Sequence, residues 1–152
     1  MLTQPLLDKL SKLHLSGFRA ALEEQLHNPQ YTELSFEERL GLLVDIETTR
    51  RSNNSLRRRI QAARFPIAAT IEDLDLSARR GLNRGQVLQL AQSEWVDRHL
   101  NMMILGPTGA GKTYLASALG RASCEAGHKV RYERTSRLLH SLELAHADGS
   151  FP

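Results

Sequence analysis

The sequence predicts a helical N-terminal domain followed by the start of an α/β domain, a class written α + α/β. Apolar residues recur at helical spacing through the first 63 positions. A short apolar run at 102–105 then precedes a glycine-rich stretch, and an amphipathic segment follows that stretch directly. Strand, glycine-rich turn and helix in this order are typical of an α/β unit.

Three helices are expected in the N-terminal domain, which we place at residues 1–65. Leucines three and four positions apart predict the first helix, and Gly17 separates it from a second amphipathic segment. A capping box begins the third helix, with Ser35 as cap and Glu38 three residues later. The third helix is predicted to continue to about Ala63, because a Phe-Pro pair follows and disfavours helical backbone.

Positive charge is concentrated in the second half of this third helix. The chain carries 20 basic and 17 acidic side chains, a net charge of +3. Residues 1–47 hold four basic and eight acidic side chains, whereas residues 48–71 hold six basic ones and no acid. The six are Arg50, Arg51, Arg57, Arg58, Arg59 and Arg64.

These arginines form two stripes on a continuous helix. Arg50, Arg57 and Arg64 share one stripe because seven residues make nearly two turns, and a second stripe lies about a quarter-turn away. Guanidinium groups pair with phosphate oxygens in a bidentate manner, so the pattern predicts contact with duplex DNA or with a protein partner. The lack of interleaved aromatic residues favours the duplex backbone over stacked single-stranded bases. A solvated basic face, or one paired with the acidic first segment, is the alternative.

Residues 66–100 are expected to form a connector with short helices. A break is predicted at 79–83, and Asn83 suits the cap of the helix that follows. Trp95 lies shortly before the apolar run at 102–105. It has two possible roles, as the wall of a nucleotide-base pocket or in packing against the next domain.

The glycine-rich stretch fills every fixed position of the phosphate-loop pattern G-x-x-x-x-G-K-[ST]. Its glycines can adopt conformations closed to other residues, so that successive N–H groups converge on phosphate oxygens. Lys112 brings positive charge to the outer phosphates, and Thr113 offers its hydroxyl to Mg²⁺. The alternative is an ordinary glycine-rich turn. The pattern predicts an ATP and Mg²⁺ site at Gly106, Pro107, Thr108, Gly109, Ala110, Gly111, Lys112 and Thr113.

Residues 101–152 are predicted to be an incomplete α/β domain. Gly127 suits the end of the helix after the phosphate loop, and the alternating run at 129–133 predicts a second strand. The single cysteine, Cys124, has no partner for an internal disulfide and is expected to be small buried filler.

Composition favours a cytoplasmic protein with no membrane partner. No apolar run approaches the roughly 20 residues needed to cross a bilayer. The N-terminus also lacks the basic segment and long apolar core of a secretion signal.

Over its full length the chain resembles the IstB-like transposition helper ATPases of bacterial insertion sequences, which are relatives of the DnaC helicase loader in the AAA+ class. The resemblance rests on residues 34–45, 71–75, 80–82, 101–113, 130–132 and 147–150. It implies a helical domain joined to an ATPase domain, ATP-dependent assembly on duplex DNA, self-assembly of the full-length protein and stimulation of a partner transposase.

The resemblance also implies elements that cannot be placed in this sequence. These are an acidic strand that holds Mg²⁺ and activates water, sensor residues and an arginine finger. Without them we expect the phosphate loop to bind ATP but barely hydrolyse it, and we identify no catalytic residue. Further strands should lie between the two predicted here. Residues 100–152 are therefore expected to be loosely ordered or dependent on a partner, and residues 1–65 to be stable.

Two other functions stay open. One is a DnaC-like helicase loader, which would act on a replicative helicase and single strands. The other is a non-catalytic module for DNA or protein interaction, with a vestigial ATPase half.

Overall fold

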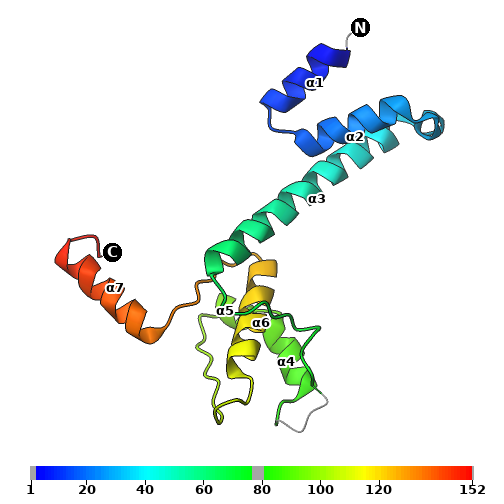
Figure 1. The fold of residues 1–152 in the computed structure, drawn as a ribbon. Coiled ribbons are helices and arrows are strands. Elements are labelled where there is room, and N and C mark those ends of the chain that lie inside the picture. The colour runs from blue at the N-terminus through cyan, green and yellow to red at the C-terminus, as the bar shows by residue number, and fades with distance from the viewer. Residues whose placement is uncertain (1–2, 77–80, 152) are drawn as a thin grey trace. The chain divides into compact units, whose positions relative to one another are not determined.

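The computed structural model describes residues 3–76 and 81–151, and in these ranges it is helical (Figure 1). The chain divides into two compact units between Ser55 and Leu56. The predicted domain borders at 65 and 100 stay a prediction. The elements are α1 (Thr3–Lys12), α2 (Ser16–His27), the 3-10 helix η1 (Pro29–Glu33), α3 (Phe36–Ala63), α4 (Arg84–Ala91), α5 (Glu94–Asp97), α6 (Lys112–Glu125) and α7 (Thr135–Ala147).

In the first unit, α1 packs against α2, and hydrogen bonds join α2 to the N-terminal half of α3 (Figure 1). The Gln25 side chain exchanges two of these bonds with Arg39, through the Arg39 carbonyl and guanidinium. Leu7, Leu10 and Leu43 are buried apolar residues of this unit. The unit is therefore held by polar joints as well as by apolar packing.

The capping box at the start of α3 is confirmed. The Ser35 N–H donates to the Glu38 carboxylate at 2.8 Å, and the Glu38 N–H donates to the Ser35 hydroxyl at 3.3 Å. The prediction that this helix continues to Ala63 is also confirmed. Arg64 then adopts a left-handed conformation with φ of 55°, which ends the helix.

The second unit has its core where α4 meets α6. Val87, Leu115 and Leu119 form the buried cluster, and apolar residues of the connector and of the segment before the phosphate loop pack around it. Asn83 caps α4 as predicted, because its side-chain oxygen accepts from the Gln86 N–H at 3.1 Å. The predicted break at 79–83 and the landmark at 80–82 lie partly outside the described residues.

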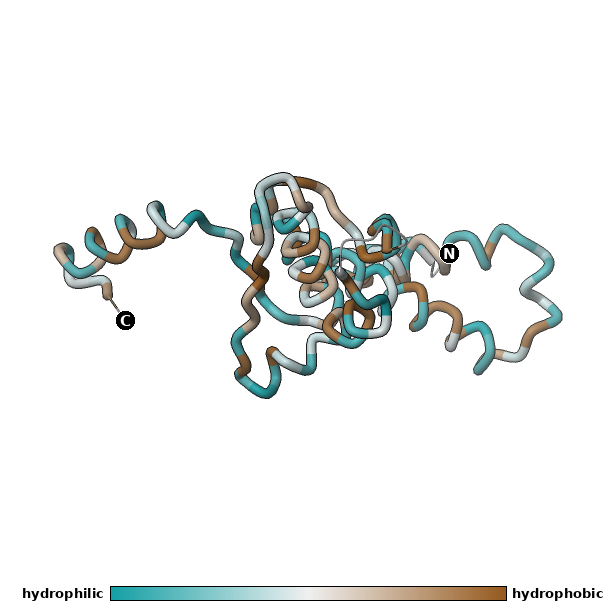
Figure 2. Tube along the Cα trace, turned by 90° about the horizontal axis from the view of Figure 1, so that it is seen from below, coloured by the Kyte–Doolittle hydropathy of each residue, from teal (hydrophilic) through white to brown (hydrophobic). Residues whose placement is uncertain are grey.

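Helix α7 buries none of its side chains. Its leucines stay partly exposed, and they appear as brown turns in the helix that leads to the C-terminus in Figure 2. No helix in the described part of the chain is both long enough and apolar enough to cross a bilayer.

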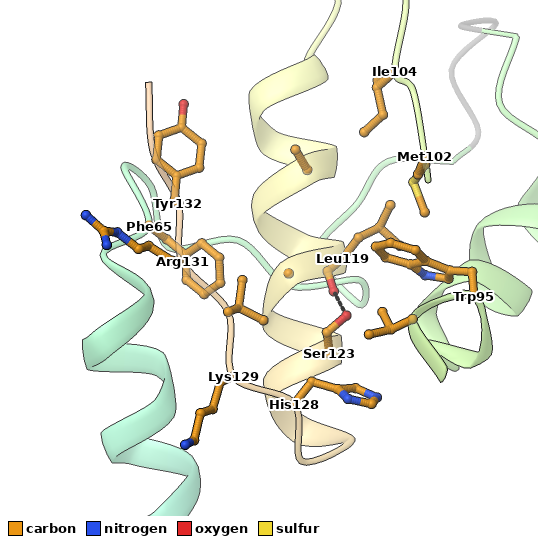
Figure 3. Close-up of a pocket in the computed structure, with 14 residues that line it drawn as sticks. Phe65, Trp95, Met102, Ile104, Leu119, Ser123, His128, Lys129, Arg131 and Tyr132 are labelled. Carbon is orange, nitrogen blue, oxygen red and sulfur yellow. Dashed lines mark hydrogen bonds between the residues drawn. The ribbon is translucent and has the colours of Figure 1, made fainter. Parts of the chain in front are cut away.

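The two predicted strands do not form in the described residues, and this corrects the α/β part of the prediction. Residues 102–105 and 129–133 form neither a strand nor a bridge. Figure 3 shows Met102 and Ile104 on one side of α6, and Lys129, Arg131 and Tyr132 on the other. A strand needs a neighbour about 4.8 Å away to complete its hydrogen bonds, and neither segment has one here. The Tyr132 N–H instead donates to the Ala63 carbonyl at 2.8 Å.

Candidate phosphate-binding site

The glycine-rich stretch forms an open turn that ends at the N-terminus of α6. Gly109 and Gly111 have φ of 82° and 87°, in the left-handed region that favours glycine. The first helical hydrogen bond runs from the Leu115 N–H to the Gly111 carbonyl. The N–H groups of residues 112–114 therefore have no acceptor among the described residues. Unpaired donors at the positive end of a helix dipole are suited to an anion.

The Lys112 ammonium lies over the same turn. Its Nζ donates to the Gly106 carbonyl at 2.8 Å and to the Pro107 carbonyl at 2.7 Å. Both acceptors are neutral. A phosphate would be a stronger partner, because charge-assisted hydrogen bonds are roughly twice as strong as neutral ones. The lysine is therefore held close to where a phosphate would lie, and it can exchange its partners.

Of the eight predicted loop residues, 106–111 lie in this turn, and Lys112 and Thr113 begin α6. Five of the eight, Gly106, Pro107, Ala110, Gly111 and Lys112, line a cavity of about 230 Å³. Thr108, Gly109 and Thr113 are exposed.

The donor set of the turn fits a phosphate chain, since it offers backbone N–H groups and one ammonium. For Mg²⁺ it offers the Thr113 hydroxyl, and no cluster of three or more His, Cys, Asp or Glu residues exists among the described residues. Mg²⁺ commonly shares few protein ligands with waters and substrate phosphates. The residues present thus fit a Mg²⁺ ion that arrives with a phosphate chain.

The cavity beside the loop has apolar walls that sequence reasoning missed. Leu74, Leu82 and Tyr114 line it together with the loop itself. Apolar walls with an aromatic ring suit the flat face of a nucleotide base. The sequence signal that could have identified Leu74 and Leu82 is their apolar character. Apolar residues in a connector are expected to pack against a neighbouring part of the fold.

Trp95 does not line this cavity. Its indole N–H donates to the Leu90 carbonyl at 3.0 Å, and its ring lines a separate hollow of about 420 Å³ (Figure 3). Met102, Ile104 and Tyr132 line that hollow too. Trp95 therefore lies at a different cavity from the phosphate loop.

Two of the six predicted arginines are engaged within the first unit. Glu47 is buried, with 5% of its surface exposed, and its carboxylate accepts from Arg50 at 2.8 Å and from Arg51 at 2.7 Å. The same carboxylate accepts from the Gly17 and Phe18 N–H groups at 2.8 and 3.1 Å. The two guanidinium groups, and then these N–H groups, hold the pKa of Glu47 well below its usual range.

The other four arginines belong to the second unit. Arg59 donates to the Cys124 carbonyl at 2.8 Å, and Cys124 is fully buried, which confirms its predicted role as filler. Arg57, Arg58 and Arg64 are exposed, and none of them has a hydrogen bond or ion pair within the described residues. The arginines that were predicted as one set therefore fall into engaged and available groups.

Comparison with known families matches residues 8–152 to the family described as IstB-like ATP binding protein. A relative from Pseudomonas fluorescens, named as an ATP-binding protein of insertion sequence IS1162, is 44% identical over 99% of this chain. A relative from Sinorhizobium fredii with a similar name is 39% identical over 99% of the chain, and one from Mycobacterium tuberculosis is 37% identical over 93%. The matched region spans 66%, 62% and 57% of the length of these three relatives.

Proposed function

Because the chain belongs to the IstB-like ATP-binding protein family, we propose that its phosphate loop at 106–113 binds ATP in the service of DNA transposition. The main support for this proposal is the N-terminus of α6, where backbone N–H groups lack acceptors among the described residues and the Lys112 ammonium lies close by. The names of the matched relatives, which refer to ATP binding and insertion sequences, support the same proposal.

In the proposed complex the triphosphate lies on the N–H groups at the start of α6. Lys112 leaves the carbonyls of Gly106 and Pro107 and contacts the outer phosphates. The Thr113 hydroxyl is a ligand of the accompanying Mg²⁺, which neutralises phosphate charge when bound. The base lies against Leu74, Leu82 and Tyr114, because these residues wall the cavity beside the loop.

We further propose that residues 102–105 and 129–133 become strands of a P-loop domain of the AAA+ type when further strands lie beside them. Met102 and Ile104, two residues apart, line the large hollow on one side of α6, and Tyr132 lines it on the other (Figure 3). Side chains alternate between the faces of a strand, so the spacing fits two strands with their apolar faces toward α6. Further strands that are not part of residues 1–152 would then fill the hollow.

Assembly on duplex DNA, self-association and stimulation of a partner transposase are proposed for the whole protein. No acidic side chain lines the cavity beside the loop, so the described residues offer no carboxylate there to activate a water. We therefore expect ATP turnover by this chain to be slow or absent. The cytoplasmic location also stays a prediction.

Calorimetric titration of the chain with Mg-ATP tests the nucleotide site. Lys112→Ala should lower the affinity at least a hundredfold, because it removes the only ammonium that lies over the loop among the described residues. Lys9→Ala, an exposed lysine on α1, makes the same change in net charge and should leave the affinity unchanged. Equal ATP affinity in wild type and Lys112→Ala would place the nucleotide elsewhere.

A non-catalytic interaction module is the second candidate. The lack of an acidic side chain in the loop cavity favours it for this chain. ATP turnover that duplex DNA stimulates would exclude this second candidate, because such stimulation requires an active ATPase. Absence of turnover fits both candidates, and absence of ATP binding would favour the interaction module.

A further inference from the structure

We propose that the second unit binds the phosphate backbone of duplex DNA through a surface built from two distant segments. This paired basic surface consists of Arg57, Arg58, Arg64, Lys129 and Arg131. It rests on the association with DNA proposed above, and it adds a segment that the sequence had assigned only to a strand. The segment after α6 thereby gains a role in binding.

One hydrogen bond joins the two segments directly, and a second joins α3 to α6, the helix that precedes the second segment. The Tyr132 N–H donates to the Ala63 carbonyl at 2.8 Å, and the Arg59 guanidinium donates to the Cys124 carbonyl at 2.8 Å. The Phe65 ring also packs so closely on α6 that a Cβ added at Gly120 would lie 2.7 Å from it. The last two turns of α3 and the segment after α6 are therefore neighbours, although more than 60 residues separate them in sequence.

The Lys129 and Arg131 side chains of the second segment point toward the side on which α3 lies (Figure 3). Lys129 and Arg131 are two residues apart on extended backbone, and this spacing puts them on one face. Figure 3 shows both side chains leaving the segment on the side away from α6, where α3 ends. Their positive charges thus lie beside the end of α3, where Arg57 and Arg58 are located (Figure 3).

The cations of this surface are mostly free to bind. Arg57, Arg58, Arg64 and Lys129 are exposed, and no ion pair or hydrogen bond engages them within the described residues. Arg131 is also exposed and is ion-paired through Nε with Glu133, which leaves its two terminal nitrogens available. Residues 128–137 contain four Lys or Arg side chains and only this one acid. Duplex DNA, with one charge per roughly 1.7 Å of its axis, is the matching partner.

The nearby aromatic rings argue for duplex rather than single-stranded nucleic acid. Phe65 and Tyr132 are the aromatic residues of these two segments, and both line the apolar hollow. Both rings are half-buried, whereas single-strand binders display aromatic rings for stacking on successive bases. Backbone contact with a duplex needs only the cations.

Fluorescence anisotropy of the full chain with a labelled mixed-sequence duplex, at several salt concentrations, tests the proposal. The double variant Lys129→Ala, Arg131→Ala should lower the slope of log affinity against log salt by about 2, since each phosphate contact contributes about 0.9. Arg57→Ala with Arg58→Ala should have a similar effect. Between 50 and 200 mM salt the wild type should then lose roughly tenfold more affinity than either variant.

The control is Lys9→Ala with Lys12→Ala, an equal change of charge on α1, and its slope should match that of the wild type. Glu133→Gln provides an independent readout and should strengthen binding, because it removes the acid from the surface. An unchanged slope in the Lys129 and Arg131 variant, with a lower slope in the α3 variant, would overturn the inference while the association with DNA stands. No duplex binding by the wild type, or tighter binding of a single strand or an acidic peptide, would overturn the duplex surface without bearing on ATP binding.

Discussion

The N-termini of α2 and α6 pose the same electrostatic problem, and the chain solves it differently in its two units. Neither helix has a side-chain hydrogen bond from its N-cap residue, Leu15 or Gly111. At α2 the Glu47 carboxylate accepts from the N–H groups of Gly17 and Phe18, and Arg50 and Arg51 neutralise it. At α6 no carboxylate of the described residues approaches, and Lys112 rests on neutral carbonyls.

This difference shows that the same attraction of a helix N-terminus for negative charge can hold a fold together or bind a ligand. A helix N-terminus stabilises negative charge through its dipole and its unpaired N–H groups. Where the chain supplies that charge itself, the result is a joint that fixes α3 against the turn between α1 and α2. Where no side chain of the described residues supplies the negative charge, as at α6, the N-terminus is suited to a bound phosphate.

Glycine serves the two termini for different reasons. A Cβ at Gly17 would lie 2.9 Å from both the Glu47 carboxylate and the Arg50 side chain, so the joint requires a close approach. A Cβ at Gly109 would meet nothing within 4 Å, but its φ of 82° is strained for other residues. Gly17 therefore leaves space for the Glu47 and Arg50 side chains, and Gly109 allows the left-handed backbone of the turn.

Glu47→Gln should have the largest effect on the joint between α2 and α3. An amide cannot neutralise Arg50 and Arg51, and it leaves donors of the joint without a charged acceptor. We expect the largest loss of stability of any single substitution in residues 3–55, measured as a lower urea midpoint for these residues. The pH dependence should change with it. The pKa of Glu47 is lowered from its ordinary value of 4.5, so the unfolded chain binds the proton more tightly.

The Glu47 contribution to stability is therefore complete above about pH 4.5, and it is lost as pH falls through the lower pKa of the folded state. Acid titration of the wild type should show this loss, and Glu47→Gln should show a flatter profile. Parallel profiles in the two proteins would mean that Glu47 does not carry the joint.

Gly17→Ala should have a smaller effect in the same direction. The added methyl group forces Glu47 or Arg50 to move, and such overpacking costs about 1–2 kcal/mol of unfolding free energy. Gly41→Ala is the matched control, because this helical glycine has open space around it. It should stabilise α3 by about 0.5–1 kcal/mol. Urea unfolding of both variants checks the pair, and two changes of the same sign would contradict the assignment.

The sequence was sufficient to predict those structural features that depend on residues close together in the chain. The capping box at Ser35, the cap at Asn83 and the run of α3 to Ala63 depend on residues a few positions apart, and all three are confirmed. The phosphate loop is a local pattern too, and its open turn could be anticipated residue by residue.

Features that join distant residues could not be anticipated. Glu47 meets backbone groups about 30 residues away, so its burial was not evident. Pairing of the arginines with the acidic first segment was an open alternative, and Arg50 and Arg51 do pair with Glu47. Leu74 and Leu82 approach the loop from a connector without any period. The alternating run at 129–133 did predict extended backbone, but a strand also needs a neighbour, which no local pattern supplies.

The most direct test of the two helix termini is an amide NMR spectrum of the labelled chain with and without Mg-ATP. The account predicts shifts for the N–H resonances of Gly109, Gly111, Lys112 and Thr113. It predicts none for Gly17 and Phe18, whose N–H groups already donate to Glu47. Unmoved loop resonances, or shifts of equal size at Gly17 and Phe18, would contradict it.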